Sequence, residues 1–435
     1  MLRQGFAYLL RPSFPTLLAA LLLRGSAAGD DWPVWLGPTR DGISRETGWL
    51  KDWPETGPRR LFEKKIGEGY SAVAVQEGRV VLFHRVKDEV RIEALDALTG
   101  ADAWRHAYPT DYVDRYGYNG GPRCAPVIDG RGAEARVFAL GPTGAIHALE
   151  LASGKLLWSR ELEAELRLEP NFFGVGAAPL VEGGLIIVNL GGTDPGTGAV
   201  VALDTATGKT VWKTRTDGGS YAAPRAADAG GVRRIFVFHR GGLSALDPAD
   251  GSEKWRFPWQ SRLYESVNAA TPLVIGDTLL ISSSYGTGSV ALRLKKDAYD
   301  VIWQDDLRSR EKRLDAHWST PLVLDGHVFG FGGRHEQGSS LRCVELSSGT
   351  VKWSWESYLG RGSMIHADGL EIALGERGDL SLLRLGPGGH EELRRVRGVL
   401  RYPAWTPPVL ANGILYLRDE SVLIAMDLRP RKEIR

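Results

Sequence analysis

Short hydrophobic runs alternate with polar turns along most of this chain, and residues 201–212 show the arrangement clearly. Leu203 and Trp212 lie on either side of the turn Thr207–Gly208, in a stretch that also holds several valines. Valine and aromatic side chains suit a pleated, half-buried strand, and glycine adopts the positive φ of a tight turn at little cost. The pattern predicts two strands joined by a tight turn.

The same hairpin recurs along the chain. In five copies an acidic residue lies eight positions before a tryptophan and a glycine lies four positions before it. A sixth copy keeps the tryptophan but has Ala298–Tyr299 in place of the turn pair. The tryptophans expected to dock one repeat on the next are Trp104, Trp158, Trp212, Trp255, Trp303 and Trp353.

A second landmark precedes these hairpins. One or two small residues, a proline and an apolar run begin 31 to 33 positions before the tryptophan, as at Ala178–Pro179. A period of roughly 40–50 residues with four short strands per unit is typical of the blades of a β-propeller. A single blade cannot bury both faces of its sheet, so neighbouring blades must stack against it.

The ends of the repeat array predict how the ring closes. Residues 59–66 read as an outer strand with no blade in front of it, and the last blade, residues 408–428, lacks such a strand. We expect the two to pair, because closure removes free sheet edges. The predicted fold is all-β: an eight-bladed β-propeller of four-stranded antiparallel blades with tryptophan-docking motifs, closed by the N-terminal strand.

The repeat Ala-x-Asp-x-x-Thr-Gly-x-x-x-Trp resembles the tryptophan-docking repeat of the pyrroloquinoline quinone (PQQ)-type propeller family, over residues 59–429. That family holds the quinoprotein alcohol dehydrogenases, the outer-membrane assembly lipoprotein BamB and many non-catalytic members. The resemblance implies the propeller fold. It does not decide between these activities, because the docking motif is scaffold in every member.

The first 28 residues are typical of a secretory signal. Arg3 and Arg11 supply positive charge, residues 17–23 form a short apolar core, and Ser26–Ala28 provides the small residues of a cleavage site. The apolar run is far shorter than the roughly 20 residues of a membrane-spanning helix. We therefore expect an exported protein, periplasmic or extracellular, that has no membrane span.

Residues 29–58 are rich in Trp, Pro and Gly and have no repeat period. They resemble the leader of a large bacterial group of exported PQQ-like repeat proteins. We expect them to form a strap packed over the edge or bottom of the ring, anchored by Trp32, Trp35 and Trp53. The propeller follows at residues 59–429, and residues 430–435 form a basic tail.

Charge and cysteine content exclude several classes of function. The 54 basic and 53 acidic residues give a net charge of +1, which removes the bulk electrostatic argument for a nucleic-acid partner. Cys124 and Cys343 occupy positions that hold small residues in other repeats, in the second and sixth blades. A disulfide needs Cα atoms within about 7 Å, so we expect two free, buried thiols. No cluster has zinc-ligand spacing.

The connections between blades vary in length while the blades do not. They run from each docking tryptophan to the next proline landmark, so all are expected on one face around the channel, where function is usually carried by variable loops. They are rich in aromatic residues mixed with Arg, Asn and His, a composition typical of ligand or partner surfaces. The turn that contains Asp194 is expected on the opposite face. The candidate ligand or partner face comprises Tyr116, Tyr118, Asn119, Arg123, Asn171, Phe172, Tyr264, Glu265, Asn268, His317 and Trp318.

Three interpretations of these loops stay open. The preferred one is an exported, non-catalytic, monomeric scaffold that binds a protein, peptide or glycan. The alternative is a quinoprotein-like dehydrogenase that binds PQQ and calcium in the channel, with Glu265 and Asn268 as conceivable calcium ligands. Against it, the chain has no adjacent Cys-Cys pair and no match to the catalytic Asp segment of those enzymes. The third interpretation is structural: the aromatic residues plug the channel mouth. No catalytic, cofactor or metal residue is assigned.

Export makes the first testable prediction. When the full chain is expressed in a bacterial host, the mature protein should begin at Gly29, because cleavage is expected after Ala28. Mass spectrometry of the N-terminal peptide measures this directly. A mature protein that retains Met1 would contradict the prediction.

Overall fold

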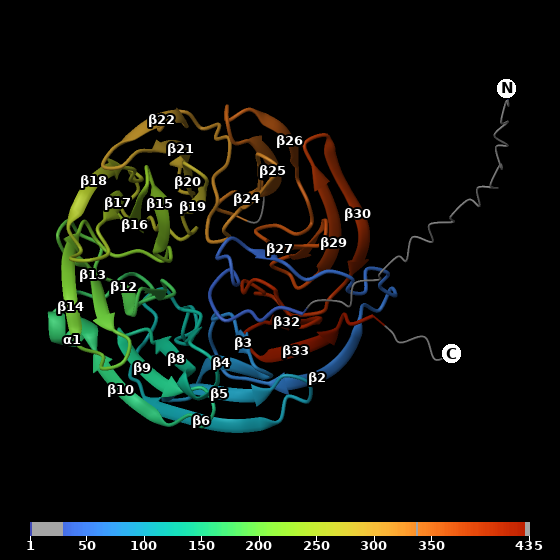
Figure 1. The fold of residues 1–435 in the computed structure, drawn as a ribbon, viewed down its shortest axis with the longest axis horizontal. Coiled ribbons are helices and arrows are strands. Elements are labelled where there is room, and N and C mark those ends of the chain that lie inside the picture. The colour runs from blue at the N-terminus through green and yellow to red at the C-terminus, as the bar shows by residue number, and fades with distance from the viewer. Residues whose placement is uncertain (2–28, 336–337, 431–435) are drawn as a thin grey trace.

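Eight β-sheets follow one another around a central channel, as Figure 1 shows. The computed structural model describes Met1 and residues 29–335 and 338–430. The predicted eight-bladed β-propeller is confirmed. The expected signal segment and basic tail lie outside the described residues, apart from Met1 and Pro430.

Each of the first four blades has four antiparallel strands, numbered from the channel outward. The first blade comprises β3 (Ala74–Gln76), β4 (Arg79–Val86), β5 (Glu89–Asp96) and β6 (Asp102–Pro109). The second comprises β7 (Val127–Asp129), β8 (Arg136–Leu140), β9 (Ala145–Glu150) and β10 (Leu156–Glu161). The third comprises β11 (Leu180–Glu182), β12 (Leu185–Gly191), β13 (Gly198–Asp204) and β14 (Thr210–Thr216). The fourth comprises β15 (Arg225–Ala229), β16 (Val232–His239), β17 (Gly242–Leu246) and β18 (Glu253–Pro258).

The last four blades complete the circle. The fifth comprises β19 (Leu273–Ile275), β20 (Thr278–Ser283), β21 (Gly288–Leu294) and β22 (Tyr299–Gln304). The sixth comprises β23 (Leu322–Leu324), β24 (His327–Gly332), β25 (Ser340–Glu345) and β26 (Val351–Trp355). The seventh comprises β27 (Ser363–Ala367), β28 (Leu370–Leu374), β29 (Leu380–Gly386) and β30 (Gly389–Val396), with β1 (Ile43–Ser44) as a fifth strand. The eighth comprises β31 (Val409–Ala411), β32 (Ile414–Arg418), β33 (Val422–Asp427) and β2 (Arg59–Lys65).

Two short helical segments interrupt the β-structure. The 3₁₀ helix η1 (Gly132–Glu134) lies between β7 and β8, and the helix α1 (Leu162–Leu166) follows β10. The sequence pattern predicts neither. Both lie outside the hairpins, so the repeat that predicts the strands carries no information about them.

Successive blades are joined by a tryptophan that lies on the hairpin of the next blade. The ring of Trp212 covers Gly251, where a Cβ atom would overlap the indole, and Trp212 Nε1 donates a hydrogen bond to the carbonyl oxygen of Pro248 at 2.9 Å. Gly251 also has a φ of 71°. Glycine is therefore required twice over, by backbone conformation and by the close approach of the indole. Trp104, Trp158 and Trp303 dock in the same way, on the carbonyl oxygens of Leu151, Thr205 and Leu346.

The degenerate fifth repeat changes this contact. Tyr299 occupies the position of the docking glycine, and its ring packs against Trp255 with centroids 4.8 Å apart. Among the residues that the structure describes, no acceptor reaches Trp255 Nε1. An aromatic pair has therefore replaced the indole–glycine contact at this junction.

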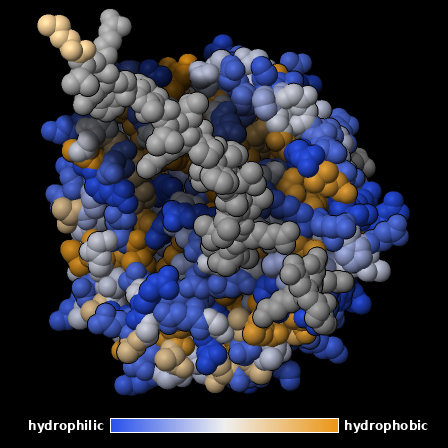
Figure 2. All heavy atoms as spheres, turned by 45° about the vertical axis from the view of Figure 1, so that its right-hand side comes forward, coloured by the Kyte–Doolittle hydropathy of each residue, from blue (hydrophilic) through white to orange (hydrophobic). Residues whose placement is uncertain are grey.

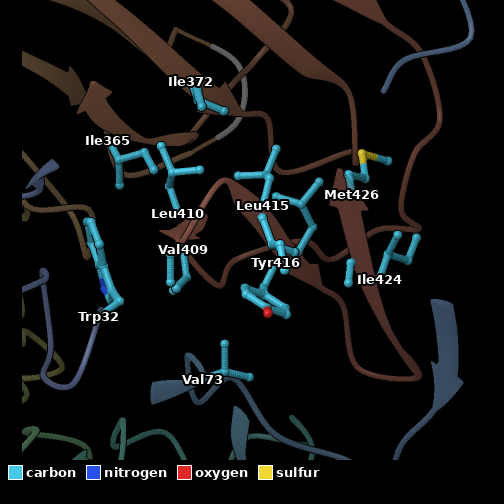
Figure 3. Packing of buried hydrophobic residues seen from close by; sticks show 14 of the residues in the cluster. Trp32, Val73, Ile365, Ile372, Val409, Leu410, Leu415, Tyr416, Ile424 and Met426 are labelled. Carbon is cyan, nitrogen blue, oxygen red and sulfur yellow. The ribbon is translucent and has the colours of Figure 1, made fainter. Parts of the chain in front are cut away.

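The eighth blade closes the ring as predicted. β2 pairs antiparallel with β33, and Phe62 of β2 lies over Gly100 in the place that a docking tryptophan takes elsewhere. The adjoining core includes Ile372 of the seventh blade, and Leu415 and Tyr416 of the eighth (Figure 3). The same cluster includes Val80, Leu82 and Leu95 of the first blade, so one hydrophobic core joins the first blade to the last two.

The N-terminal strap, residues 29–58, contacts the innermost part of every blade. In Figure 1 it is the blue segment that lies across the centre of the ring. Its backbone pairs with Val75, accepts a hydrogen bond from the N–H of Ile128 and donates one to the carbonyl oxygen of Leu428. Its strand β1 pairs in parallel with β27 and so adds to the sheet of the seventh blade. It also contacts Val181, Arg225, Thr271 and Leu322, and in the eighth blade Asn412, directly after β31. Trp32 and Trp53 are buried and Trp35 is half-buried, so the strap closes one end of the channel.

Both cysteines are free and buried, as predicted. Three histidines, His84, His147 and His239, are buried as well. Burial, with a smaller contribution from the positive charge of Arg256, lowers the pKa of His239 to about 4. Asp217 and Glu253 oppose that shift. Burial next to His106 lowers the pKa of His147 to about 4.

Replacing a docking tryptophan should destabilise the ring. Trp212→Ala should lower the free energy of unfolding by about 3–5 kcal/mol, because it removes a buried indole and leaves a cavity between two blades. Val211→Ala, on the exposed side of the same strand, is the matched control and should cost less than about 1 kcal/mol. Reversible denaturation with urea measures both. Equal costs for the two variants would contradict the docking role.

The buried histidines should make the fold sensitive to acid. The unfolded chain binds a proton at His239 below about pH 6.5, whereas the folded chain does so only near pH 4. Stability should therefore fall as the pH is lowered from 6.5 to 4, by up to about 1.4 kcal/mol per pH unit for this group. His239→Gln should flatten the slope measured by denaturation at pH 7, 6 and 5. His390→Gln, at an exposed site, should leave it unchanged. If the two variants have the same slope, His239 does not carry the effect.

Candidate functional site

A cavity of about 220 Å³ lies in the channel between the strap and the connections between blades. Trp35 and Leu36 of the strap form its floor. Tyr118 and Phe173, which belong to connections, stand at its other end. Because the strap closes the channel below, this cavity is a blind pocket that faces the connections.

One register position in each blade supplies the wall of this pocket. The position lies three residues before the proline landmark, or before Val73 and Met364 in the two blades that lack the proline. All eight residues at this position line the cavity. They are Tyr70, Arg123, Gly176, Tyr221, Ala269, Trp318, Arg361 and Trp405.

Five of these residues, from consecutive blades, form a continuous arc of aromatic and guanidinium groups. The guanidinium carbon of Arg361 lies 4.6 Å from the ring centroid of Trp318 and 5.7 Å from that of Trp405. The rings of Trp405 and Tyr70 are 5.2 Å apart, and Arg123 lies 5.2 Å from the centroid of Tyr70. Arginine stacks well on aromatic faces, so each member restricts the conformation of its neighbours.

Buried carboxylates hold the two arginines from behind. Glu376 accepts hydrogen bonds from Arg361 Nε and Nη2 at 3.1 and 2.7 Å, and also from Trp405 Nε1 at 3.3 Å. Asp114 accepts from Arg123 Nη2 at 2.9 Å. The side chains of Glu376 and Asp114 are both fully buried. The arginines are therefore fixed in place, and the surface that they help to form in the pocket is cationic and aromatic.

A second cluster of predicted residues lies on the rim of the pocket. Tyr116 packs against Phe172 with centroids 6.0 Å apart, and Phe172 packs edge-on against Tyr264 at 5.8 Å. The hydroxyl of Tyr116 donates to Glu265 Oε1 at 3.5 Å. Arg240 lies over both Phe172 and Tyr264. Three connections that are distant in the sequence therefore meet at this rim.

Several predicted residues have mainly structural contacts. Asn268 is buried and donates to the carbonyl oxygen of His239 at 2.9 Å. Asn171 accepts a hydrogen bond from the backbone N–H of Phe172, and Asn119 donates to Glu420. Phe172 is itself buried, with 3% exposure. These residues shape the connections, whereas Tyr116, Tyr118 and Tyr264 present exposed rings.

His317 and Trp318 belong to the pocket wall. His317 Nε2 lies 2.9 Å from the hydroxyl of Tyr285, and burial lowers the pKa of His317 to about 3. Trp318 Nε1 is buried and has no hydrogen-bond partner within the described residues. At neutral pH the histidine is therefore uncharged, and Trp318 of the pocket wall has a buried donor without a partner in the described part of the chain.

One expectation about the faces of the ring is wrong. Asp194 lies in the turn between β12 and β13, on the same side of the ring as the connections: Gly192 of this turn packs against Glu169 of a connection. The reason is strand parity. The turn after the second strand of a blade returns to the side on which the blade begins, so the docking hairpins, and not these turns, form the opposite face.

The sequence prediction missed several pocket residues. Tyr70, Tyr221, Arg361 and Trp405 were not among the candidate residues, although each carries the register position of Arg123 and Trp318. For Tyr221 and Trp405 the available signal was their constant offset from the proline landmark, whereas the blades of Tyr70 and Arg361 lack that proline. Comparing that one position across the six repeats that carry the proline would have identified six of the eight wall residues.

The pocket does not fit a quinone with its calcium ion. Calcium needs several oxygen ligands, and no Asp or Glu is among the residues that line the cavity within the described ranges. Glu265 and Asn268 do not converge as ligands, because Glu265 lies on the rim with Tyr116 and Asn268 is bonded to His239. Across residues 29–335 and 338–430, no group of three or more His, Cys, Asp or Glu residues is arranged to hold a metal ion.

The described part of the chain contains no helix that is long and apolar enough to cross a membrane. Figure 2 shows hydrophobic patches interrupted by hydrophilic residues on the face that it presents.

Solved structures share this fold. BamB from Moraxella catarrhalis superposes with a TM-score of 0.59 at 18% sequence identity, covering 86% of this chain and 99% of that one. A europium-containing methanol dehydrogenase superposes with a TM-score of 0.65 at 10% identity, covering 91% of this chain and 89% of that one. At these identities the likeness concerns the propeller alone.

Sequence comparison is more specific. The chain is 24% identical over 229 residues to the outer membrane protein assembly factor BamB of Moranella endobia (strain PCIT), a match that covers 51% of this chain and 55% of that protein. The chain thus spans about half the length of this curated relative. The family profile described as outer membrane protein assembly factor BamB matches residues 54–167, 88–292 and 144–388, which together cover more than half of the chain. The chain therefore belongs to this family of PQQ-like repeat β-propellers.

Proposed function

We propose that this protein is an exported, non-catalytic scaffold that binds a partner protein through the face formed by the connections between blades. The observation that carries the proposal is the combination of a fixed aromatic and arginine pocket with exposed aromatic rings around it. The relatives named as assembly factors support a protein as the class of partner.

The exposed rings are unusual for a surface that faces only water. Tyr264 is 62% exposed, Tyr402 56%, Tyr118 46% and Tyr116 39%. Val113 and Leu263, in the same two connections as Tyr118 and Tyr264, are also exposed. Aromatic residues and arginine are enriched at the centres of protein interfaces, and truncating such an anchor commonly costs about 2 kcal/mol or more of binding energy.

The rim is also organised before any partner binds. Arg240 donates hydrogen bonds to the carbonyl oxygens of Tyr264 and Ser266 while it stacks on Phe172. Glu265 links the connection of Tyr264 to that of Tyr116. Loops fixed in this way lose little conformational freedom on binding, and this saving favours affinity. A plug that only seals the channel would not need exposed rings around its outer edge.

Site-specific photo-crosslinking tests the proposal in the exporting host. A photoreactive phenylalanine analogue placed at Tyr264 or Tyr402 should yield a discrete crosslinked protein, identified by mass spectrometry. The same analogue at Lys209, an exposed position in the hairpin turn on the opposite face, is the matched control and should yield none. Replacing Tyr116 and Tyr118 by Ser together should reduce the yield at Tyr264 at least about fivefold, because partner anchors are lost.

Two outcomes would contradict this function. Crosslinks at Lys209 with none at Tyr264 and Tyr402 would place the partner on the docking-hairpin face. A discrete protein captured equally from all three positions would show contact without a preferred face.

A further inference from the structure

We infer that the blind pocket receives a single aromatic side chain, which the partner protein projects into it as an anchor. This inference rests on the proposed function and names the group that the centre of the face recognises.

The size of the pocket is the first argument. Sites for cofactors and drug-sized ligands typically enclose about 300–1,000 Å³, whereas this cavity has about 220 Å³. Because Trp35 and Leu36 close it below, a chain cannot thread through it. Only one protruding group of limited size can enter, and it must enter from the side of the connections.

The chemistry of the wall is the second argument. The arc from Trp318 through Arg361 to Trp405 presents rings and a guanidinium group, and the carboxylate that neutralises Arg361 lies behind it, fully buried. A guanidinium group attracts the negative face of an aromatic ring, and ring edges attract ring faces. A ligand cation is disfavoured there, because Arg361 and Arg123 already occupy cation–π positions on these rings.

The side chains on one side of the pocket wall are smaller than those on the other, and this difference leaves space for a ligand group. In the fifth blade the register position holds Ala269 instead of a large side chain, whereas the space beside Gly176 of the third blade is filled by the ring of Tyr221. Ala269 is partly exposed, and the neighbouring Val267 adds apolar surface. A flat ring can therefore lie against Ala269 and Val267 on one side and the aromatic arc on the other.

An unsatisfied donor refines the expected anchor. Trp318 Nε1 has no acceptor among the described residues, and a buried donor without a partner lowers stability. A tyrosine hydroxyl can accept from it after a small shift of the indole, whereas a phenylalanine ring cannot. Tyrosine should therefore be preferred to phenylalanine.

Amino-acid probes test the pocket directly. N-acetyl-tyrosinamide and N-acetyl-phenylalaninamide are titrated into the purified protein, with N-acetyl-leucinamide and methyl glucoside as comparisons, and binding is followed by ligand-observed NMR. The aromatic amides should bind, the tyrosine amide most tightly, and at least about tenfold more tightly than the leucine amide, a difference equivalent to about 1.4 kcal/mol. If methyl glucoside binds more tightly than the aromatic amides, the inference is overturned in favour of a sugar ligand. If the leucine amide binds as tightly as the aromatic amides, the inference is overturned in favour of an apolar pocket with no preference for aromatic groups.

Filling the pocket provides the mutational test. Ala269→Phe should place a ring in the cavity and weaken binding of the tyrosine amide at least tenfold, whereas Ala103→Phe, at an exposed position on β6, should leave it unchanged. Arg361→Lys keeps the charge but loses the planar stack, and should weaken binding without filling the cavity. It provides an independent test should Ala269→Phe fail to fold. Unchanged binding in a folded Ala269→Phe or in Arg361→Lys would overturn the inference.

The two proposals fail in different ways. If Ala269→Phe abolishes probe binding while crosslinking at Tyr264 shows no partner, the pocket recognises an aromatic group and the proposed function is wrong. If crosslinking at Tyr264 persists in Ala269→Phe at its original yield, the face binds a partner and the aromatic anchor is wrong.

Discussion

The contact between an indole ring and the bare backbone of a glycine in the next blade holds this ring together. Both faces of a four-stranded blade are hydrophobic, and a single blade cannot bury either of them. Each blade is therefore stable only between its neighbours. Trp212 over Gly251 meets that requirement with one large ring and one hydrogen bond. The rigidity of the connections after Trp104, Trp158, Trp212 and Trp303 depends on it, because each of them starts at a strand that such a ring has fixed. Where Tyr299 replaces the glycine, an aromatic pair fulfils the same task.

The strap makes the two ends of the channel different. A propeller without it would have a channel open at both ends, and the two faces would differ only in their loops. With Trp35 and Leu36 in the channel, one end is closed, and the residues contributed by the eight blades become the walls of a pocket. The arginines in that wall could not be held in place by aromatic stacking alone. Glu376 and Asp114 fix their orientation from behind, at the cost of burying two carboxylates that must remain paired.

The ring and its closure could be predicted from the sequence because they follow from local spacing. Trp212 and Gly208 lie four positions apart in one hairpin, and β2 is conspicuous as a strand without a blade. The pocket could be predicted only in part. Trp318 attracts attention beside His317, whereas Arg361 has no aromatic neighbour in the sequence and meets Trp318 and Trp405 only in space. Ala269 matters because its small side chain leaves space in the pocket, and the composition of the sequence does not show where such space lies.

The pairing of β2 with β33 has a consequence for how the protein forms. Residues near the start of the propeller find their partners only among the last residues of the chain, and the strap likewise contacts Leu428. Closing so long a loop costs entropy before any contact compensates for it, and contacts between residues distant in the sequence slow folding. The first seven blades can stack while the chain is being made, but the ring cannot close until the final strand is present. The C-terminal strand therefore acts as the folding checkpoint, and a chain truncated before β33 would keep an open, adhesive edge.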